Sequence, residues 1–344
     1  TTAGRLTLAG GNHKVSLLAE LDDGDAIKTP KGEVRPSQLH RERMDLSYAF
    51  ARDDSSVLLF VGKLDTDDTG TPALPMDIRY IDTSLAGAQL SLDLTDRVSL
   101  DGRVAWNDVE HLMDNFGLRQ APMPAMQRQN LTTGTGGQVS VSADIALRES
   151  TLKLGIDATT ADHDATITNP NNAMFRVDNF VDVERDVSSI FAEWRMNSER
   201  GDLEFGLRAK RVEADSGEVG SAGMMGDMGA NVALLADAFN ASDRSQTWNS
   251  VDAVVKYRLH VASGTEWRVE AGSKTRAPSY QELYLWLPLQ ATGGLADGRS
   301  YIGGIDLDEE RSNEIAIGFG RDIGRFTISP QVFYRRVDGY IQGV

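Results

Sequence analysis

The ten residues 138–147, QVSVSADIAL, alternate strictly between polar and apolar side chains. Val139, Val141 and Ala143 fall on one face of an extended chain, whereas Ser140 falls on the other. Successive side chains of a β-strand point to opposite sides of the sheet. This period of two therefore predicts a strand with one apolar and one polar face.

The same alternation continues along the chain in both directions. It repeats in AQLSLDL at 88–94, VDAVVKYRLHV at 251–261 and RFTISPQVFYRR at 325–336. No segment has the 3.6-residue period of a long amphipathic helix. We therefore expect an all-β chain without long helices.

The connections between these predicted strands alternate in length. Short polar turns fall near residues 10–12, 53–54, 95–96, 148–150, 198–201, 263–264 and 321–324. Long irregular connections lie between them, near residues 22–36, 64–76, 112–132, 160–180, 214–246 and 274–310. Each period then holds two long strands, one short turn and one long loop, which predicts about 14 strands.

Long strands with short turns on one side and long loops on the other are typical of one fold class. They predict an antiparallel up-and-down transmembrane β-barrel, whose apolar face meets lipid and whose polar face lines the lumen. A β-propeller blade has four short strands in each period, and strands of soluble sheets are usually shorter. A soluble β-rich adhesin or binding module is the alternative, which insolubility without detergent would exclude.

Composition narrows the function classes. The 344 residues include no Cys and carry a net charge of −16. The lack of Cys excludes disulfides, thiolate zinc sites and a cysteine nucleophile, and the acidic charge argues against nucleic acid as a partner. No apolar run approaches the ~20 residues of a membrane helix. Both ends read as strands, so we expect about 14 strands of a larger barrel.

Two motifs near the C-terminal end carry a family resemblance. Residues 276–284 read RAPSYQELY, and residues 307–315 read LDEERSNEI, with an acidic residue where the family often has Pro. Together they resemble the late barrel of TonB-dependent outer-membrane receptors. We expect these motifs to build a corner of the barrel rather than a binding site.

The resemblance implies a location and partners. Residues 1–344 would be a transmembrane barrel segment in the outer membrane of a Gram-negative bacterium, in contact with outer-membrane lipid. The N-terminal plug and the C-terminal end of the barrel would lie outside this chain. The TonB complex would act through that missing plug.

Methionines gather in the long connections, although methionine normally fills apolar cores. The thioether is a soft ligand that suits Cu(I), and the long loops of outer-membrane barrels face outside the cell. A flexible loop also tolerates Met without any role, so one such loop alone decides nothing. The candidate ligands in these connections are Met123, Met126, Met224, Met225 and Met228.

His111-Leu112-Met113 is the sharpest candidate. It resembles the His-x-Met pair of the copper-receptor branch of the TonB-dependent family. At positions i and i+2 of an extended chain, His111 and Met113 project to the same side and can enter one lumen. The resemblance implies that copper is a transported ligand and not a catalytic cofactor.

Other functions predict different residues. A receptor for an iron chelate or another nutrient would use aromatic and Arg-lined loops. An outer-membrane hydrolase needs a nucleophile with a His and a carboxylate in reach, and no such set is evident, so we predict no enzymatic activity. We expect Asp162-His163-Asp164 to be a solvated loop rather than a site for a hard cation.

Overall fold

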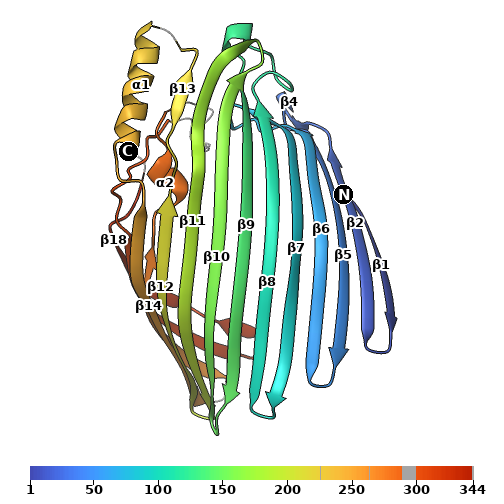
Figure 1. Ribbon diagram of the computed structural model, residues 1–344. Coiled ribbons are helices and arrows are strands. Elements are labelled where there is room, and N and C mark those ends of the chain that lie inside the picture. Colours follow the sequence, from blue (N-terminus) through green and yellow to red (C-terminus); the bar gives the residue numbers. More distant parts are fainter. Residues whose placement is uncertain (225, 263, 289–299, 343–344) are drawn as a thin grey trace.

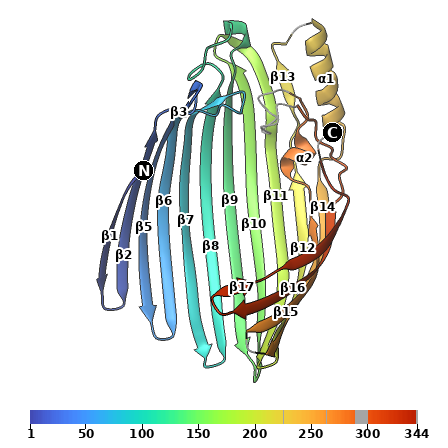
Figure 2. The same ribbon diagram turned by 180° about the vertical axis from the view of Figure 1, so that it is seen from behind.

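A computed structural model describes residues 1–224, 226–262, 264–288 and 300–342. In this part of the chain, antiparallel strands form one 16-stranded sheet that curves into a tall wall (Figures 1 and 2). Fourteen strands follow one another along the main path, which confirms the expected strand number and the up-and-down order. They are β1 (Thr2–Gly10), β2 (His13–Gly24), β5 (Leu39–Arg52), β6 (Ser55–Thr69), β7 (Asp77–Thr95), β8 (Val98–Asp114), β9 (Gln129–Ala146), β10 (Ser150–Asn169), β11 (Asn172–Ser198), β12 (Gly201–Asp215), β14 (Gln246–Ala262), β15 (Thr265–Arg276), β16 (Glu310–Ile323) and β17 (Phe326–Ile328).

The remaining elements lie beside this path. Strand β13 (Gly220–Ala222) pairs with β11, and β18 (Gln331–Asp338) pairs with β16. β17 and β18 were expected as one strand, but the chain breaks between them at Pro330, which has no N–H to donate to the ladder. The other elements are the hairpin β3 (Ile27–Thr29) and β4 (Gly32–Val34), the 3₁₀ turn η1 (Pro124–Met126), and the helices α1 (Gly226–Asn240) and α2 (Tyr280–Tyr284).

The expected alternation of faces is present in the register. Val141 of β9 lies opposite Ile156 of β10, and Ile156 lies opposite Ile190 of β11. All three side chains are exposed, and Ile190 keeps 62% of its surface. A contiguous apolar face of this size on the outside of a sheet needs a covering partner, and lipid is that partner in an outer-membrane barrel.

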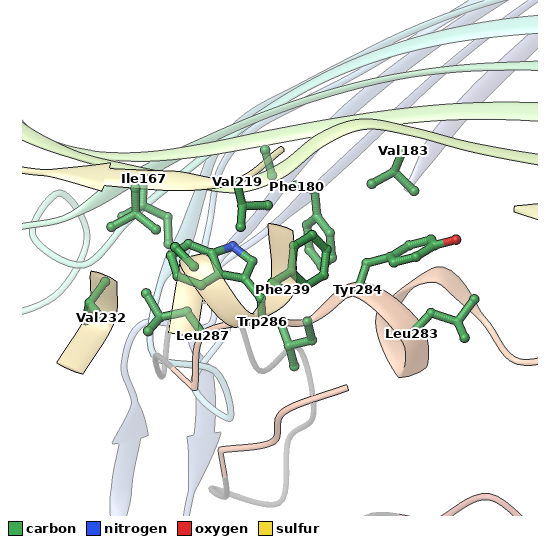
Figure 3. Packing of buried hydrophobic residues seen from close by; sticks show 14 of the residues in the cluster. Ile167, Phe180, Val183, Val219, Val232, Phe239, Leu283, Tyr284, Trp286 and Leu287 are labelled. Atoms are coloured by element: carbon green, nitrogen blue, oxygen red, sulfur yellow. The ribbon is translucent and has the colours of Figure 1, made fainter. Parts of the chain in front are cut away.

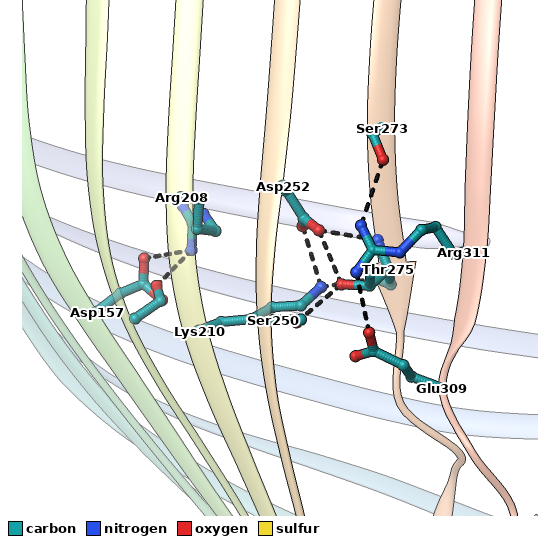
Figure 4. Close-up of polar contacts among 10 residues, drawn as sticks. Asp157, Arg208, Lys210, Ser250, Asp252, Ser273, Thr275, Glu309 and Arg311 are labelled. Carbon is teal, nitrogen blue, oxygen red and sulfur yellow. Dashed lines mark hydrogen bonds and ion pairs between the residues drawn. The ribbon is translucent and has the colours of Figure 1, made fainter.

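Charged and polar side chains join the strands on the opposite face (Figure 4). Arg208 of β12 donates to Asp157 of β10 at 2.7 Å. Lys210, one inward position further along β12, donates to Asp252 of β14 at 3.0 Å and to the Thr275 carbonyl at 2.6 Å. These contacts join strands that are adjacent or two apart in the sheet, so the lumen-facing side is polar, as predicted.

The hydrophobic core of this chain lies at the rim of the wall, where the long connections are (Figure 3). Trp286 and Leu287 pack there with Phe239 of α1 and Ile167 of β10. The indole N–H of Trp286 donates to the Asp178 carbonyl at 3.0 Å. The core therefore holds the long connections against β10 and β11, while the wall itself has no enclosed apolar core in the described residues.

Two expectations for the long connections were wrong. Residues 160–180 are not a loop, because β10 and β11 extend past the rest of the wall and turn at residues 170–171 (Figure 1). Ile167 and Val177 are fully buried there by the hydrophobic core at the rim. These apolar side chains therefore pack against distant segments of the chain and do not face lipid. The connection 214–246 contains α1, a 15-residue helix. Neither helix in the described residues is long and apolar enough to cross a membrane.

The two family motifs meet at one corner of the wall. Arg276 donates to Glu310 at 2.8 Å and to Glu282 at 2.7 Å. Ser279 caps α2, since its hydroxyl accepts from the Glu282 N–H while the Glu282 carboxylate accepts from the Ser279 N–H. The two motifs therefore build the corner. Tyr280 in α2 faces the lumen side of β10 and β11, because its ring contacts His163 of β10 and Phe180 of β11.

Candidate metal site

The rim end of β8 carries His111 and Met113 on the inward face. Val104 and Trp106, at even positions of the same strand, are about half exposed on the lipid side. His111 and Met113 occupy odd positions, so they point to the lumen, and both are partly buried. The structure therefore brings these two predicted ligands to one side, as their spacing requires.

A second imidazole lies across the neighbouring strand. In the register, Val109 of β8 lies opposite Gly134 of β9, and Gly134 lies opposite His163 of β10. Thr132, two residues before Gly134, lies opposite His111. His163 and His111 therefore stand on opposite sides of β9, offset by one inward position, with the side-chain-free Gly134 between them.

His163 is held by aromatic rings. Its imidazole lies 4.6 Å from the Tyr280 ring and 5.3 Å from the Phe180 ring, measured between centroids. The Phe180 and Tyr280 rings also contact each other edge to face, at 5.3 Å. The expectation of a solvated loop at 162–164 was therefore wrong, because strand pairing and these rings order His163.

Both imidazoles favour their neutral form. This part of β8 and β10 stands beyond the lipid-facing band, because the outward positions nearby are Glu110 and Asp162. Burial lowers the pKa of His111, and burial also lowers the pKa of His163, where it outweighs the opposing effect of the Asp164 charge. Neutral imidazole is the form that binds metals. The Nε2 atom of His111 is buried and has no hydrogen-bond partner in the described part of the chain.

A buried ion pair clamps the two connections beside this site. Arg119 donates to both carboxylate oxygens of Asp77, at 2.7 and 2.6 Å, and to the Leu74 carbonyl at 3.0 Å. Asp77 is fully buried. It pairs with Asp114 at the start of the β7–β8 ladder. The connection 70–76 is thereby fixed to the segment that follows β8.

This clamp places a methionine that the sequence did not single out as a ligand. Met76 immediately precedes Asp77 and is only 3% exposed. Its carbonyl accepts a hydrogen bond from the Thr71 hydroxyl. Ile78, two residues later, lies opposite Met113. Met76 therefore lies beside the end of β8 that carries Met113. The available signal was that the connections 64–76 and 112–132 stand at the two ends of the antiparallel pair β7–β8 that meet at the rim.

The other candidate methionines are not gathered at this site. Met123 precedes η1 and Met126 ends it, and they keep 68% and 57% of their surface. Met228 lies on α1 and is 70% exposed, whereas Met224 packs against the rim core. Met225 lies outside the described residues. Of the six predicted ligands that lie in the described residues, the structure brings together only His111 and Met113.

The donor set is soft. Among the described residues, no three His, Cys, Asp or Glu side chains gather closely enough to hold a metal ion. A metal bound near His111 would therefore rely on thioether sulfur and imidazole nitrogen. That combination suits copper better than zinc, calcium or magnesium, which take thiolate, several imidazoles or oxygen ligands.

Comparison with known families identifies the barrel. The family model described as TonB dependent receptor-like, beta-barrel matches residues 33–344. This chain belongs to the TonB-dependent receptor family. Receptors of this family are located in the outer membrane of Gram-negative bacteria, so the apolar outer face of this receptor barrel contacts lipid. The family and the similar structures are receptors and transporters rather than enzymes.

Solved structures share this fold at low sequence identity. A copper transporter, OprC, is 16% identical with a TM-score of 0.75, over 96% of this chain and 50% of that one. The FrpB iron transporter from Neisseria meningitidis is 14% identical with a TM-score of 0.66, over 97% and 51%. The Serratia marcescens hemophore receptor HasR, solved with its hemophore HasA and heme, is 14% identical with a TM-score of 0.68, over 98% and 52%.

These similarities establish the fold alone. The receptor barrel described here spans about half the length of these structures. No curated protein sequence matches this chain.

Proposed function

We propose that this receptor barrel binds copper at its rim, on His111 and Met113 with Met76 beside them, and takes part in copper import. One observation carries the proposal: His111 and Met113 share the lumen face of β8, and the Nε2 atom of His111 is buried without a hydrogen-bond partner. A buried polar atom without a partner is costly unless a ligand satisfies it. A metal ion is a suitable partner for a neutral imidazole nitrogen.

The chemistry of the neighbouring donors favours copper. Thioether sulfur is neutral and soft, which selects Cu(I) over harder ions. The Arg119–Asp77 clamp supports the site because it holds the Met76 segment against the end of β8. The similarity to the copper transporter OprC agrees with this choice, although the low sequence identity shows only that the two proteins share a fold.

The exposed methionines have a separate proposed role. Met123, Met126 and Met228 are exposed at the rim. Met224 packs against the rim core, and in the sequence Met224 and Met225 stand close to Met228. We propose that they capture copper outside the cell and pass it to the buried site. Import itself would depend on the TonB complex acting through a plug, as the family membership suggests.

Copper titration of the receptor that contains this barrel tests the proposal. Cu(I) affinity is measured in detergent by competition with a chromogenic Cu(I) chelator. The double variant His111→Ala/Met113→Ala should bind Cu(I) more weakly by more than ~100-fold. Removing a residue that only hydrogen-bonds to a metal ligand already lowers metal affinity by up to ~100-fold, and this variant removes two ligands. The matched control, His260→Ala/Met44→Leu, changes an imidazole at the opposite end of the wall and a thioether on the outer face. Equal Cu(I) affinity of both double variants would refute the site.

An iron-chelate receptor is the second candidate, because FrpB and HasR share the fold at similar coverage. The same receptor is titrated with ferric chelates and heme in place of Cu(I). Tight binding of a ferric ligand that is indifferent to His111→Ala, together with absent Cu(I) binding, would establish this alternative.

A further inference from the structure

We propose that His111 and His163 form a two-imidazole position for Cu(II) that spans Gly134 beside the thioether position. The inference rests on the proposed copper function, since both positions share His111. It adds a ligand, His163, and a second oxidation state of the metal. The position formed by His111 and the thioethers takes Cu(I), and the position formed by His111 and His163 takes Cu(II).

The register brings the two rings within reach of one ion. Strands two apart in a sheet are separated by about 10 Å, and the offset of one inward position adds about 6.6 Å along the strand, so the two Cα atoms lie about 12 Å apart. Two imidazole side chains that lean toward each other on the concave face can span that distance through one ion. Gly134, on the strand between them, adds no side chain to this space: a β-carbon placed there would lie 3.1 Å from the Asp162 carbonyl oxygen and 3.8 Å from Nδ1 of His163.

The ring nitrogens are available. Nε2 of His111 is buried without a partner, and no hydrogen bond to the His163 ring is found among the described residues. Phe180 and Tyr280 contact the faces and edges of the His163 ring but supply no donor to its nitrogens. The buried Nε2 of His111 is costly to leave without a partner, and a metal ion would satisfy it. His163 is partly buried and would supply the second nitrogen.

The donor types separate the two oxidation states. Cu(II) favours nitrogen and oxygen ligands in tetragonal geometry, whereas thioether ligands favour Cu(I). Because His111 belongs to both positions, the barrel binds one ion at a time in either state. No electron transfer is required, since each ion is bound in the state in which it arrives.

Electron paramagnetic resonance of the receptor loaded with one equivalent of Cu(II) tests the proposal. We expect nitrogen superhyperfine structure from two equatorial nitrogens. His163→Gln, which keeps the bulk beside Tyr280 and Phe180, should leave one nitrogen and weaken Cu(II) binding by about tenfold or more, the range found for metal-site partners. His260→Ala, the matched control near the short turns, should leave the spectrum unchanged.

The outcomes distinguish this inference from the proposed function. An unchanged two-nitrogen spectrum in His163→Gln overturns the inference, whatever the Cu(I) affinity. Loss of one nitrogen with Cu(I) affinity unchanged supports it. Absent Cu(I) binding with the two-nitrogen Cu(II) spectrum retained refutes the thioether site but supports the imidazole pair. Heat-modifiable gel mobility of each variant verifies that the barrel is folded.

Discussion

The Arg119–Asp77 clamp gives a prediction whose size follows from burial. Replacing Arg119 by Met keeps much of the aliphatic bulk but removes the guanidinium that donates to Asp77 and Leu74. The Asp77 carboxylate, fully buried, then loses its counter-charge. We expect the connection 70–76 to detach from the end of β8 while the β7–β8 ladder, which is held by backbone hydrogen bonds, remains formed.

The magnitude comes from the cost of an unpaired buried charge. Breaking a buried ion pair costs about 3–5 kcal/mol. Arg119 is partly exposed, and the Thr71 amide still donates to Asp77 at 2.9 Å, so we take the lower end, about 3 kcal/mol. Since ~1.4 kcal/mol is a factor of ten in an equilibrium constant, the local opening equilibrium should rise about 100-fold.

Hydrogen exchange with mass spectrometry measures this opening in the detergent-solubilised receptor. Amides of 70–76 should exchange about 100-fold faster in Arg119→Met, while peptides from the middle of β7 and β8 keep their protection. The matched control is Arg35→Met, because Arg35 forms an exposed ion pair with Glu33 that is worth about 0–1 kcal/mol. Unchanged exchange of 70–76 would refute the clamp as the element that fixes Met76.

Three further predictions probe the site, the lipid face and the rim core. Gly134→Val places a side chain beside Nδ1 of His163 and a β-carbon against the Asp162 carbonyl, so β10 must shift slightly; Cu(II) affinity in chelator competition should fall about tenfold or more, with Cu(I) affinity changed by less than about twofold. Ile156→Lys puts a charge on the lipid face at a cost of about 2–4 kcal/mol, so heat-modifiable gel mobility should be lost, whereas the inward Ser140→Lys should retain it. Trp286→Ala empties a buried position at a cost of about 3–5 kcal/mol, and exchange protection at the tips of β10 and β11 should fall; unaltered protection there would contradict the packing role of Trp286.

Much of this barrel was predictable from local pattern. The period of two in 138–147 and its repeats specified strands with one lipid face, because each residue on a strand alternates sides without reference to distant contacts. The alternation of short turns and long connections then predicted the strand order and number. His111 and Met113 were predictable as a pair facing one side, since two residues apart on one strand is a local relation.

Contacts between distant segments decided the rest. Strands β10 and β11 continue through 160–180 because the rim core buries Ile167 and Val177 on a segment whose pattern no longer matches a lipid-facing strand. Met76 is held beside the end of β8 by an ion pair between two different connections, which neither connection encodes alone.

The placement of His111 and His163 on one face, across β9, is the clearest case. The two residues lie on strands separated by β9, and only the register that brings Gly134 between them opens the space above it. Sequence determined which faces are apolar, which residues are soft donors and where the chain turns, because these are properties of neighbouring residues. Tertiary structure decided which donors meet, because that depends on the stagger of three strands and on the packing of the rim.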